Sequence, residues 1–103
     1  MKKLLAILLV LCMVIPAAAL GEEVVKIGVY EPATGDSGAG GKQEMLGMQY
    51  ANELFPTVKI GDTEYKVELV YADNGSSSDK APSAAQKLVS ENVSVVLGSY
   101  GSS

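Results

Sequence analysis

Three stretches of the chain have the apolar pattern of β-strands. Residues 24–30 are mostly apolar and β-branched and are bounded by a glutamate pair and a proline, which predicts a strand. After a turn signal at Gly61 and Asp62, apolar and polar side chains alternate over residues 64–71, and the mostly polar face suits a strand at the edge of a sheet. Residues 93–97 are almost wholly apolar, which is typical of a strand covered on both faces.

A helical period separates the first two predicted strands. Within residues 42–55, Met45, Met48 and Phe55 fall near one stripe, and Pro56 cannot continue the helix. Three more apolar residues widen the stripe: Leu46, Tyr50 and Leu54. We interpret the two methionines as helix core rather than as a ligand surface.

A second helix is predicted between the second and third strands. Five apolar residues follow the amphipathic template i, i+3, i+4, i+7, i+8, namely Ala81, Ala84, Ala85, Leu88 and Val89. Ser78 or Asp79 is expected to cap this helix, and Pro82 falls in its first turn, where a missing amide donor costs nothing.

Strand, helix, strand, helix and strand in this order form a βαβαβ unit, and crossovers of this length give a parallel sheet. A half-polar second strand at the edge and an apolar third strand inside give the strand order 2-1-3. The first and third strands then lie side by side at a topological switch point, where open α/β sheets bind ligands at the carboxyl ends of their strands. We therefore predict an α/β fold in which residues 31–41 and 98–103 meet.

The amino-terminal residues have the pattern of an export signal. Two lysines precede an unbroken run of twelve apolar residues, 4–15, and the residues after it are small. Twelve residues span about 18 Å as a helix, against roughly 30 Å for a hydrocarbon core, so a signal peptide is favoured over a membrane-spanning helix. Cleavage after Ala19 would make residues 1–19 a signal peptide and residues 20–103 the mature part.

Composition narrows the chemistry of the chain. Its 103 residues include eight lysines, twelve carboxylates, no arginine and no histidine, for a net charge of −4, so no nucleic-acid partner is expected. The absence of histidine and the single cysteine remove most zinc sites, His-based triads and any internal disulfide. No acid–base pair of carboxylates and no nucleophile with a partner base stands out. We predict a binding protein, not an enzyme, with no catalytic residue, metal or cofactor.

Residues 98–103 combine glycines, serines and one aromatic ring at the end of a predicted strand. Exposed amides and the positive end of a following helix would receive a carboxylate or a phosphate there. Ser102 or Ser103 would equally serve as the N-cap of that helix, and the two roles can coexist.

Residues 35–43 invite a phosphate-loop interpretation that fails in detail. A Walker loop needs glycine where Asp36 stands and Ser or Thr where Gln43 stands, and the dinucleotide pattern that starts at Gly38 lacks its third glycine. A turn that lets the backbone approach a ligand or a facing lobe is preferred. Asp73 could receive a ribose hydroxyl, but a turn with the Asn-Gly pair after it is favoured.

Six short segments of the mature part carry a family resemblance. They are residues 25–29 (VKIGV), 32–35 (PATG), 40–44 (GGKQE, followed by Gly47), 68–73 (ELVYAD), 84–89 (AAQKLV) and 96–103 (VLGSYGSS). Together and in this order they resemble the amino-terminal part of the periplasmic solute-binding proteins of the leucine/isoleucine/valine class, which serve ABC importers.

The resemblance implies a two-lobe fold that closes on its ligand, with residues 20–103 as the first part of lobe 1 and the remainder beyond them. In that family a serine after the third strand and nearby amides hold the carboxylate of the ligand. The serine aligns with Ser102, and Tyr100, Gly101 and Ser103 lie beside it as further ligand-binding residues.

The implied function is the periplasmic substrate-binding component of an ABC importer. It would capture a small zwitterion, an amino acid of the branched-chain type or a related amide, and deliver it to a permease in the inner membrane. An acid on the second lobe would pair with the ammonium group. Two alternatives stay open: a ligand-sensing receptor domain of the same fold and, less favoured because of export, a nucleotide-binding enzyme domain.

Overall fold

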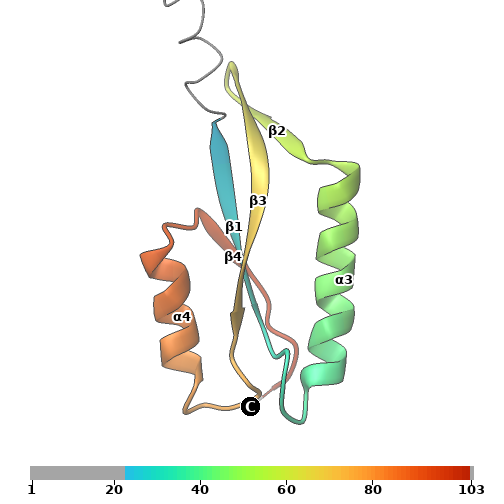
Figure 1. Ribbon diagram of the computed structural model, residues 1–103, viewed down its shortest axis with the longest axis vertical. Helices are drawn as coiled ribbons and strands as arrows, with labels where there is room; N and C mark the ends of the chain where they lie inside the picture. The colour runs from blue at the N-terminus through green and yellow to red at the C-terminus, as the bar shows by residue number, and fades with distance from the viewer. Residues whose placement is uncertain (1–22, 103) are drawn as a thin grey trace, which may run out of the picture.

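The computed structural model describes residues 23–102, and this part of the chain holds four strands and two helices (Figure 1). In chain order they are β1 (Val24–Glu31), α3 (Gly38–Leu54), β2 (Thr57–Ile60), β3 (Thr63–Asp73), α4 (Ala81–Ser90) and β4 (Val95–Leu97). Neither helix is long and apolar enough to cross a membrane. The predicted signal peptide, residues 1–19, lies outside the described residues.

The strands form one sheet in the order β2-β3-β1-β4. Strand β1 pairs in parallel with β3 along its whole length, from Val24 opposite Lys66 to Glu31 opposite Asp73. On its other side β1 pairs in parallel with the three residues of β4. The α/β fold and the order 2-1-3 of the three parallel strands are therefore confirmed, with β3 as the second and β4 as the third.

Strand β2 was not predicted. It runs antiparallel to β3, with Thr57 opposite Lys66 and Ile60 opposite Thr63, around a turn in which Gly61 has a φ of +62°. Residues 57–60 (TVKI) do alternate polar and apolar side chains, but the sequence prediction treated them only as the approach to the turn at Gly61. All four are exposed. The prediction that the second strand forms the edge is thus wrong for the start of β3, and holds only beyond Lys66.

Among residues 23–102 no strand flanks β4 on its outer side, so the interior position of the third strand stays a prediction. Strand β4 spans only Val95–Leu97 and lies at the end of the sheet, where its residues are 41–51% exposed. Its apolar composition matches a covered strand, but within residues 23–102 only β1 pairs with it. Apolar side chains indicate that a strand is suited to burial, and they do not determine how many neighbours it has.

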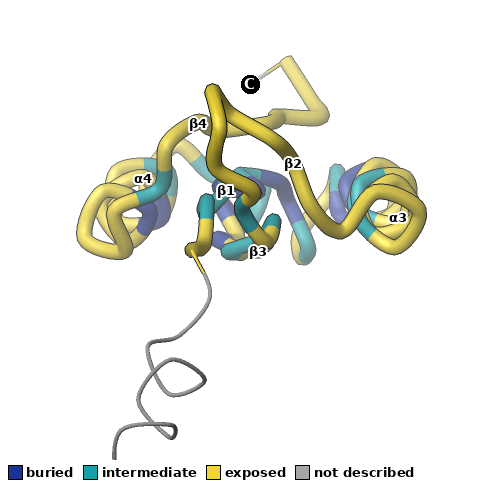
Figure 2. Tube along the Cα trace, turned by 90° about the horizontal axis from the view of Figure 1, so that it is seen from above, coloured by how far each residue is buried: buried dark blue, intermediate teal, exposed yellow. Residues whose placement is uncertain are grey.

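The two helices lie on opposite sides of the strands (Figure 2). The chain crosses from β1 to β3 through α3, then back past β1 to β4 through α4. Because both parallel crossovers are right-handed as a rule, this reversal of direction places the helices on opposite faces.

Helix α3 ends at Leu54, two residues before Pro56, which was expected to stop it. It begins at Gly38, four residues before the predicted start. Met45 and Met48 are half-buried, as predicted for residues facing the sheet. Phe55, which the apolar stripe was expected to include, follows the helix and is largely exposed.

Helix α4 begins at Ala81 with Pro82 in its first turn, as predicted. Its N-cap residue is Lys80 rather than Ser78 or Asp79, and no side chain caps the helix. Leu88 and Ala84 of α4 pack on Ala72 of β3 as the buried core, with Tyr30, Val70 and Val93 packed against it. The main core of the described residues therefore lies on the α4 face of the sheet.

Candidate functional site

The loops that follow β1, β3 and β4 lie together at one edge of the sheet, at the bottom of Figure 1. Parallel strands place their carboxyl ends at the same edge, so this convergence follows from the topology. The Tyr100 amide donates to Glu31 Oε2 at 2.8 Å, and Asn74 Nδ2 donates to Ser99 Oγ at 2.9 Å. The prediction that residues 31–41 and 98–103 meet is confirmed for the residues described.

The loop after β3 is tied to the loop after β1 by a serine. Ser76 Oγ donates to the Thr34 carbonyl at 2.8 Å and accepts from the Ser37 amide at 3.0 Å. The Asn74 side chain, which is 8% exposed, accepts from the Ser76 amide at 3.1 Å while it donates to Ser99. Ser76 and Asn74 together therefore link all three loops into one hydrogen-bonded edge.

The glycine run of residues 38–41 belongs to the first turn of α3 and does not form a phosphate-binding loop. A Cβ on Gly40 would overlap the ring of Tyr100, and a Cβ on Gly41 would overlap the carbonyl of Pro32. These glycines let the loops after β1 and β4 approach the start of α3. The backbone at these glycines thus approaches neighbouring loops at the same edge of the sheet.

A small cavity of about 90 Å³ opens between the three loops. It is lined by Tyr30, Ser37, Asn74, Ser76, Ser77, Ala81, Ser99, Tyr100 and Gly101. Four serines, two tyrosines and one amide side chain make its wall polar. Whole small-molecule ligands occupy roughly 300–1,000 Å³, so this cavity has room for one end of a ligand.

The amino-terminal end of α4 reaches this cavity, because Ala81, its first residue, forms part of the wall. Helix α3 also begins beside it, directly after Ser37. The Ala81 amide donates to the Ser77 carbonyl at 3.0 Å, the Gly38 amide donates to the Gly35 carbonyl at 3.0 Å, and Pro82 has no amide hydrogen. The helix starts therefore contribute mainly the partial positive charge of the helix dipole, which favours a carboxylate or another anionic group. Serine hydroxyls beside two helix starts are thus suited to a small anionic or strongly polar group.

The predicted ligand-binding residues have different places at this edge. Tyr100 and Gly101 line the cavity, and a Cβ on Gly101 would lie 3.2 Å from Ser37 Oγ. Ser102 is exposed and is not part of the cavity wall, and Ser103 lies outside the described residues. The amide of Tyr100 is already bonded to Glu31, so in this arrangement it is not free for a ligand.

Sequence reasoning missed Asn74, Ser76, Ser77 and Ser99 as residues of the cavity wall. Ser99 lies inside the segment that was singled out, but the emphasis fell on the residues after it. The other three lie in the loop after β3. Because all parallel strands have their carboxyl ends at one edge, the loop after β3 should have been included in the prediction. The prediction considered only the loops after β1 and β4, the two strands beside the switch point.

Asp73 closes the turn after β3, as the sequence predicts. Its carboxylate accepts 2.8 Å hydrogen bonds from the Ala33 amide, the Thr34 hydroxyl and the Gly75 amide. Desolvation alone would raise the pKa of Asp73, but these hydrogen bonds outweigh it and lower the pKa below its ordinary value. Both oxygens are engaged in holding the loops together, which leaves them poorly placed for a ribose hydroxyl.

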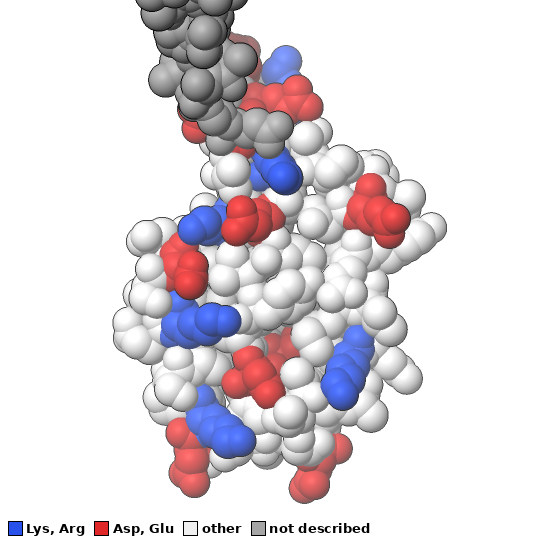
Figure 3. Space-filling view, viewed as in Figure 1, with Lys and Arg blue, Asp and Glu red and all other residues white. Residues whose placement is uncertain are grey.

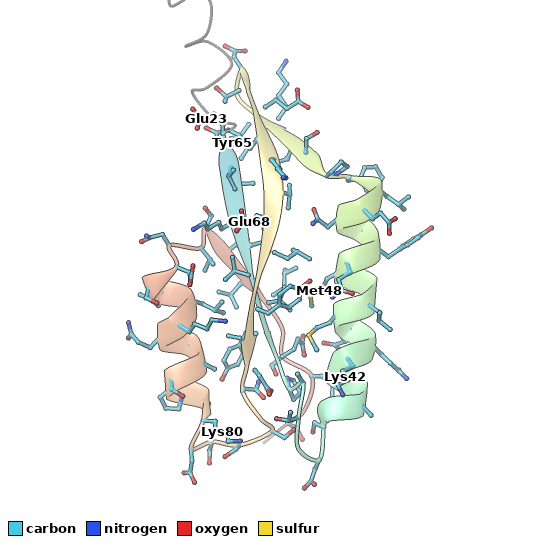
Figure 4. The ribbon with its side chains drawn as sticks, in the orientation of Figure 1. Glu23, Lys42, Met48, Tyr65, Glu68 and Lys80 are labelled. Carbon is cyan, nitrogen blue, oxygen red and sulfur yellow. The ribbon has the colours of Figure 1, made fainter. Side chains whose placement is uncertain are left out.

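Charged side chains are scattered over the face shown in Figure 3, with no large patch of one sign. Lys80 lies at the start of α4, where its side chain would contact a Cβ on Gly75 (Figure 4). Within residues 23–102 no group of three or more acidic, histidine or cysteine side chains is placed to hold a metal ion.

Two larger cavities lie on the faces of the sheet, away from the loops. One of about 710 Å³ separates α3 from the strands and includes Met48, which extends from the helix toward the sheet in Figure 4. The other, of about 600 Å³, lies beside α4 and β4. Both have mainly apolar walls and reach β4, so they coincide with the exposed apolar surface of the sheet.

Comparisons with known proteins give one match. A family model described as periplasmic binding protein matches residues 24–103. No curated protein and no solved structure matches the chain.

Proposed function

This chain belongs to the periplasmic binding protein family, and from that membership we propose that it captures a small zwitterion, an amino acid of the branched-chain type or a related amide, for an ABC importer. The observation that carries the proposal is the serine-lined cavity at the carboxyl edge of the sheet, beside the starts of α3 and α4. The carboxylate of the ligand would enter this cavity, and the rest of the ligand would extend outward from it.

The size and chemistry of the cavity support a ligand that is only partly held by this lobe. A volume of about 90 Å³ admits a carboxylate and a few neighbouring atoms. No lysine lines the wall, so serine hydroxyls would supply the contacts to the anion, with the dipoles of α3 and α4 favouring its negative charge. The ammonium group and the side chain would be recognised by a second lobe that closes over this edge.

We further propose that residues 1–19 are a signal peptide and that residues 20–103 form the amino-terminal part of lobe 1. The open edge of β4 and the apolar cavities on both faces support this, because they provide surfaces on which the remainder of an α/β lobe would pack. The mature protein would act in the periplasm and deliver its ligand to a permease.

The test is calorimetric titration of the intact exported protein with leucine, isoleucine, valine and leucinamide. Isoamylamine, which lacks the carboxylate of leucine, serves as the matched ligand control. We expect at least one amino acid or amide to bind and isoamylamine to bind far more weakly. If none of the four compounds binds, the amino-acid proposal is wrong.

Two serine variants locate the carboxylate. Ser102→Ala and Ser99→Ala should each weaken binding by about tenfold to a hundredfold if the hydroxyl contacts the charged group, since such a hydrogen bond contributes about 1.5–3 kcal/mol. Ser94→Ala, at the opposite end of β4, is the control and should leave affinity unchanged. Unchanged affinity in Ser102→Ala would remove that residue from the site, and loss in Ser99→Ala alone would assign the role to the cavity wall.

An uptake assay in cells tests whether the protein takes part in import. Uptake of the radiolabelled ligand should be lost in cells that lack the protein and restored by the wild-type protein. Normal uptake in such cells, together with ligand binding in vitro, would support the sensory receptor instead.

A further inference from the structure

Glu31, the last residue of β1, places a carboxyl group directly beneath the loop after β4. The residue is 1% exposed. Oε2 accepts the hydrogen bond from the Tyr100 amide at 2.8 Å, whereas Oε1 has no hydrogen-bond partner among the described residues. A buried polar atom without a partner is costly, and a buried ionised carboxylate is more so.

A second carboxyl group faces Glu31 from α3. Glu44, in the second turn of the helix, is itself exposed to solvent, and its carboxyl group acts on Glu31 both as a hydrogen-bonding neighbour and as a like charge. Burial raises the pKa of Glu31, the hydrogen bond from the Tyr100 amide opposes this rise, and the Glu44 carboxylate adds to it. Two carboxylates this close cannot both ionise without repulsion, but one proton between them is favourable.

The other groups around Glu31 supply no compensating positive charge. Its register partner on β3 is Asp73, whose carboxylate is occupied by the donors of the turn. Tyr100 is the one titratable residue of the described loop after β4. Among residues 23–102 no lysine donates a hydrogen bond to Glu31 or forms a salt bridge with it.

We propose that Glu31 and Glu44 share one proton and that this pair positions residues 98–102 against β1 and α3. The shared proton gives Oε1 of Glu31 its missing partner and leaves Oε2 free to accept from Tyr100. Glu31 thus acts as a positioning residue, because it sets the place of Ser99, Tyr100 and Gly101 in the cavity wall. Only this last consequence rests on the proposed function, since the proton and the loop contact do not depend on a ligand.

Proton sharing has a defined effect on stability. The native state keeps a proton that the unfolded chain releases above the ordinary glutamate pKa of 4.5. The contribution of the pair is therefore fully present below that value and is lost as the pH rises through the raised pKa of Glu31. The unfolding equilibrium constant should rise by up to tenfold per pH unit within that window, which is the limit for one proton.

The experiment follows the carboxyl carbons of the intact protein, labelled with ¹³C-glutamate, by NMR over a pH series, together with denaturant unfolding at each pH. In wild type, one glutamate should titrate above the ordinary range, and its signal should be absent from Glu31→Gln. That variant should keep its fold, because the glutamine oxygen can accept from Tyr100 while its NH₂ group donates to Glu44. Its stability should no longer decrease as the pH rises through the raised pKa of Glu31.

Three further variants separate the proton from general packing. Glu44→Gln should also abolish the fall in stability, because an amide donor replaces the shared proton. Glu53→Gln, on the same helix, is the control, and its stability should still decrease with rising pH as in wild type. Exchange of the Tyr100 amide should stay near the wild-type rate in Glu31→Gln and become about tenfold faster in Glu31→Ala, as expected for the loss of one hydrogen bond.

The proposal is overturned if every glutamate of wild type titrates in the ordinary range, or if Glu31→Gln retains the full pH dependence. If Glu31→Gln does not fold, the wild-type titration decides, with Glu44→Gln but not Glu53→Gln expected to shift the high signal. None of these measurements uses a ligand. If the protein fails to bind amino acids, the proposal of a shared proton is unaffected. If the shared proton is absent, the proposed binding of amino acids is unaffected.

Discussion

Helices α4 and α3 cover opposite faces of the same parallel strands, yet Leu88 of α4 is 2% exposed and Leu46 of α3 is 64% exposed. On the α4 face, small residues let the helix approach, and Gly28 leaves just enough room for the Leu88 side chain. The buried residues of α3 are Gly38 and Gly41, both in its first turn. Helix α4 is therefore held by an apolar core, whereas α3 is most closely packed at the end that meets the loops.

This difference has a consequence for the candidate site. The carboxyl edge is held mainly by hydrogen bonds among loops and by glycine contacts, while most of the apolar packing lies farther along α4. The site geometry therefore depends on a few polar residues, which substitutions can change without removing the core.

The largest expected effect comes from truncating the two leucines. Leu88→Ala should lower the free energy of unfolding by about 2–5 kcal/mol, because it removes a buried side chain and leaves a cavity. Leu46→Ala should change it by less than about 0.5 kcal/mol, as for other exposed positions. Denaturant unfolding of the intact protein measures both, and equal losses would show that α3 packs as closely as α4.

Two glycine substitutions should have effects of opposite sign. A Cβ at Gly28 would lie 3.1–3.2 Å from Leu88, Val93 and Val96, so Gly28→Ala should cost about 1–3 kcal/mol through overpacking. Gly47 in α3 has nothing within 4 Å of its Cβ position, and Gly47→Ala should stabilise by about 0.5–1 kcal/mol through helix propensity. A stability loss in Gly47→Ala would contradict the open packing of α3.

The smallest of the three effects concerns the edge at which the two faces meet. Asp73→Asn should cost about 1 kcal/mol near neutral pH, because an amide oxygen replaces a carboxylate that accepts three hydrogen bonds at an exposed site. Since folding lowers the pKa of Asp73, its contribution is present above the unfolded value and is lost as the pH falls through the folded one.

Unfolding in neutral and acidic buffers checks the Asp73 prediction. The difference between wild type and Asp73→Asn should shrink in acid. Asp62→Asn, in the turn at the other end of β3, should behave as wild type at both pH values. If the difference in unfolding free energy between wild type and Asp73→Asn does not change with pH, the carboxylate is not the source of the effect.

Much of the fold could be predicted because its signals are local. The β-branched run of β1, the alternation in β3 and the helical period of α4 identified their elements within a few residues. Strand β2 has only four alternating residues (TVKI), and its side chains are exposed, so its pairing with β3 is what identifies it as a strand.

The candidate site was predictable as a place and less so as a set of residues. Parallel topology brought the two chosen loops together, but the contact of Asn74 with Ser99 and the burial of Glu31 depend on side chains that no periodic pattern describes. A glutamate that ends an apolar strand just before Pro32 was the one available sign that a carboxyl group would be enclosed.

The sequence alone determined the class of each main element, the order of the parallel strands and the edge at which the loops after β1 and β4 meet. Tertiary structure alone decided that β2 pairs with the start of β3, that α3 is buried only at its start, and that Glu31 lies beneath Tyr100, 69 positions away. Periodicity reports the preferences of neighbouring residues for a backbone geometry and an apolar face. Burial and hydrogen bonding are set by residues that become neighbours only when the chain has folded.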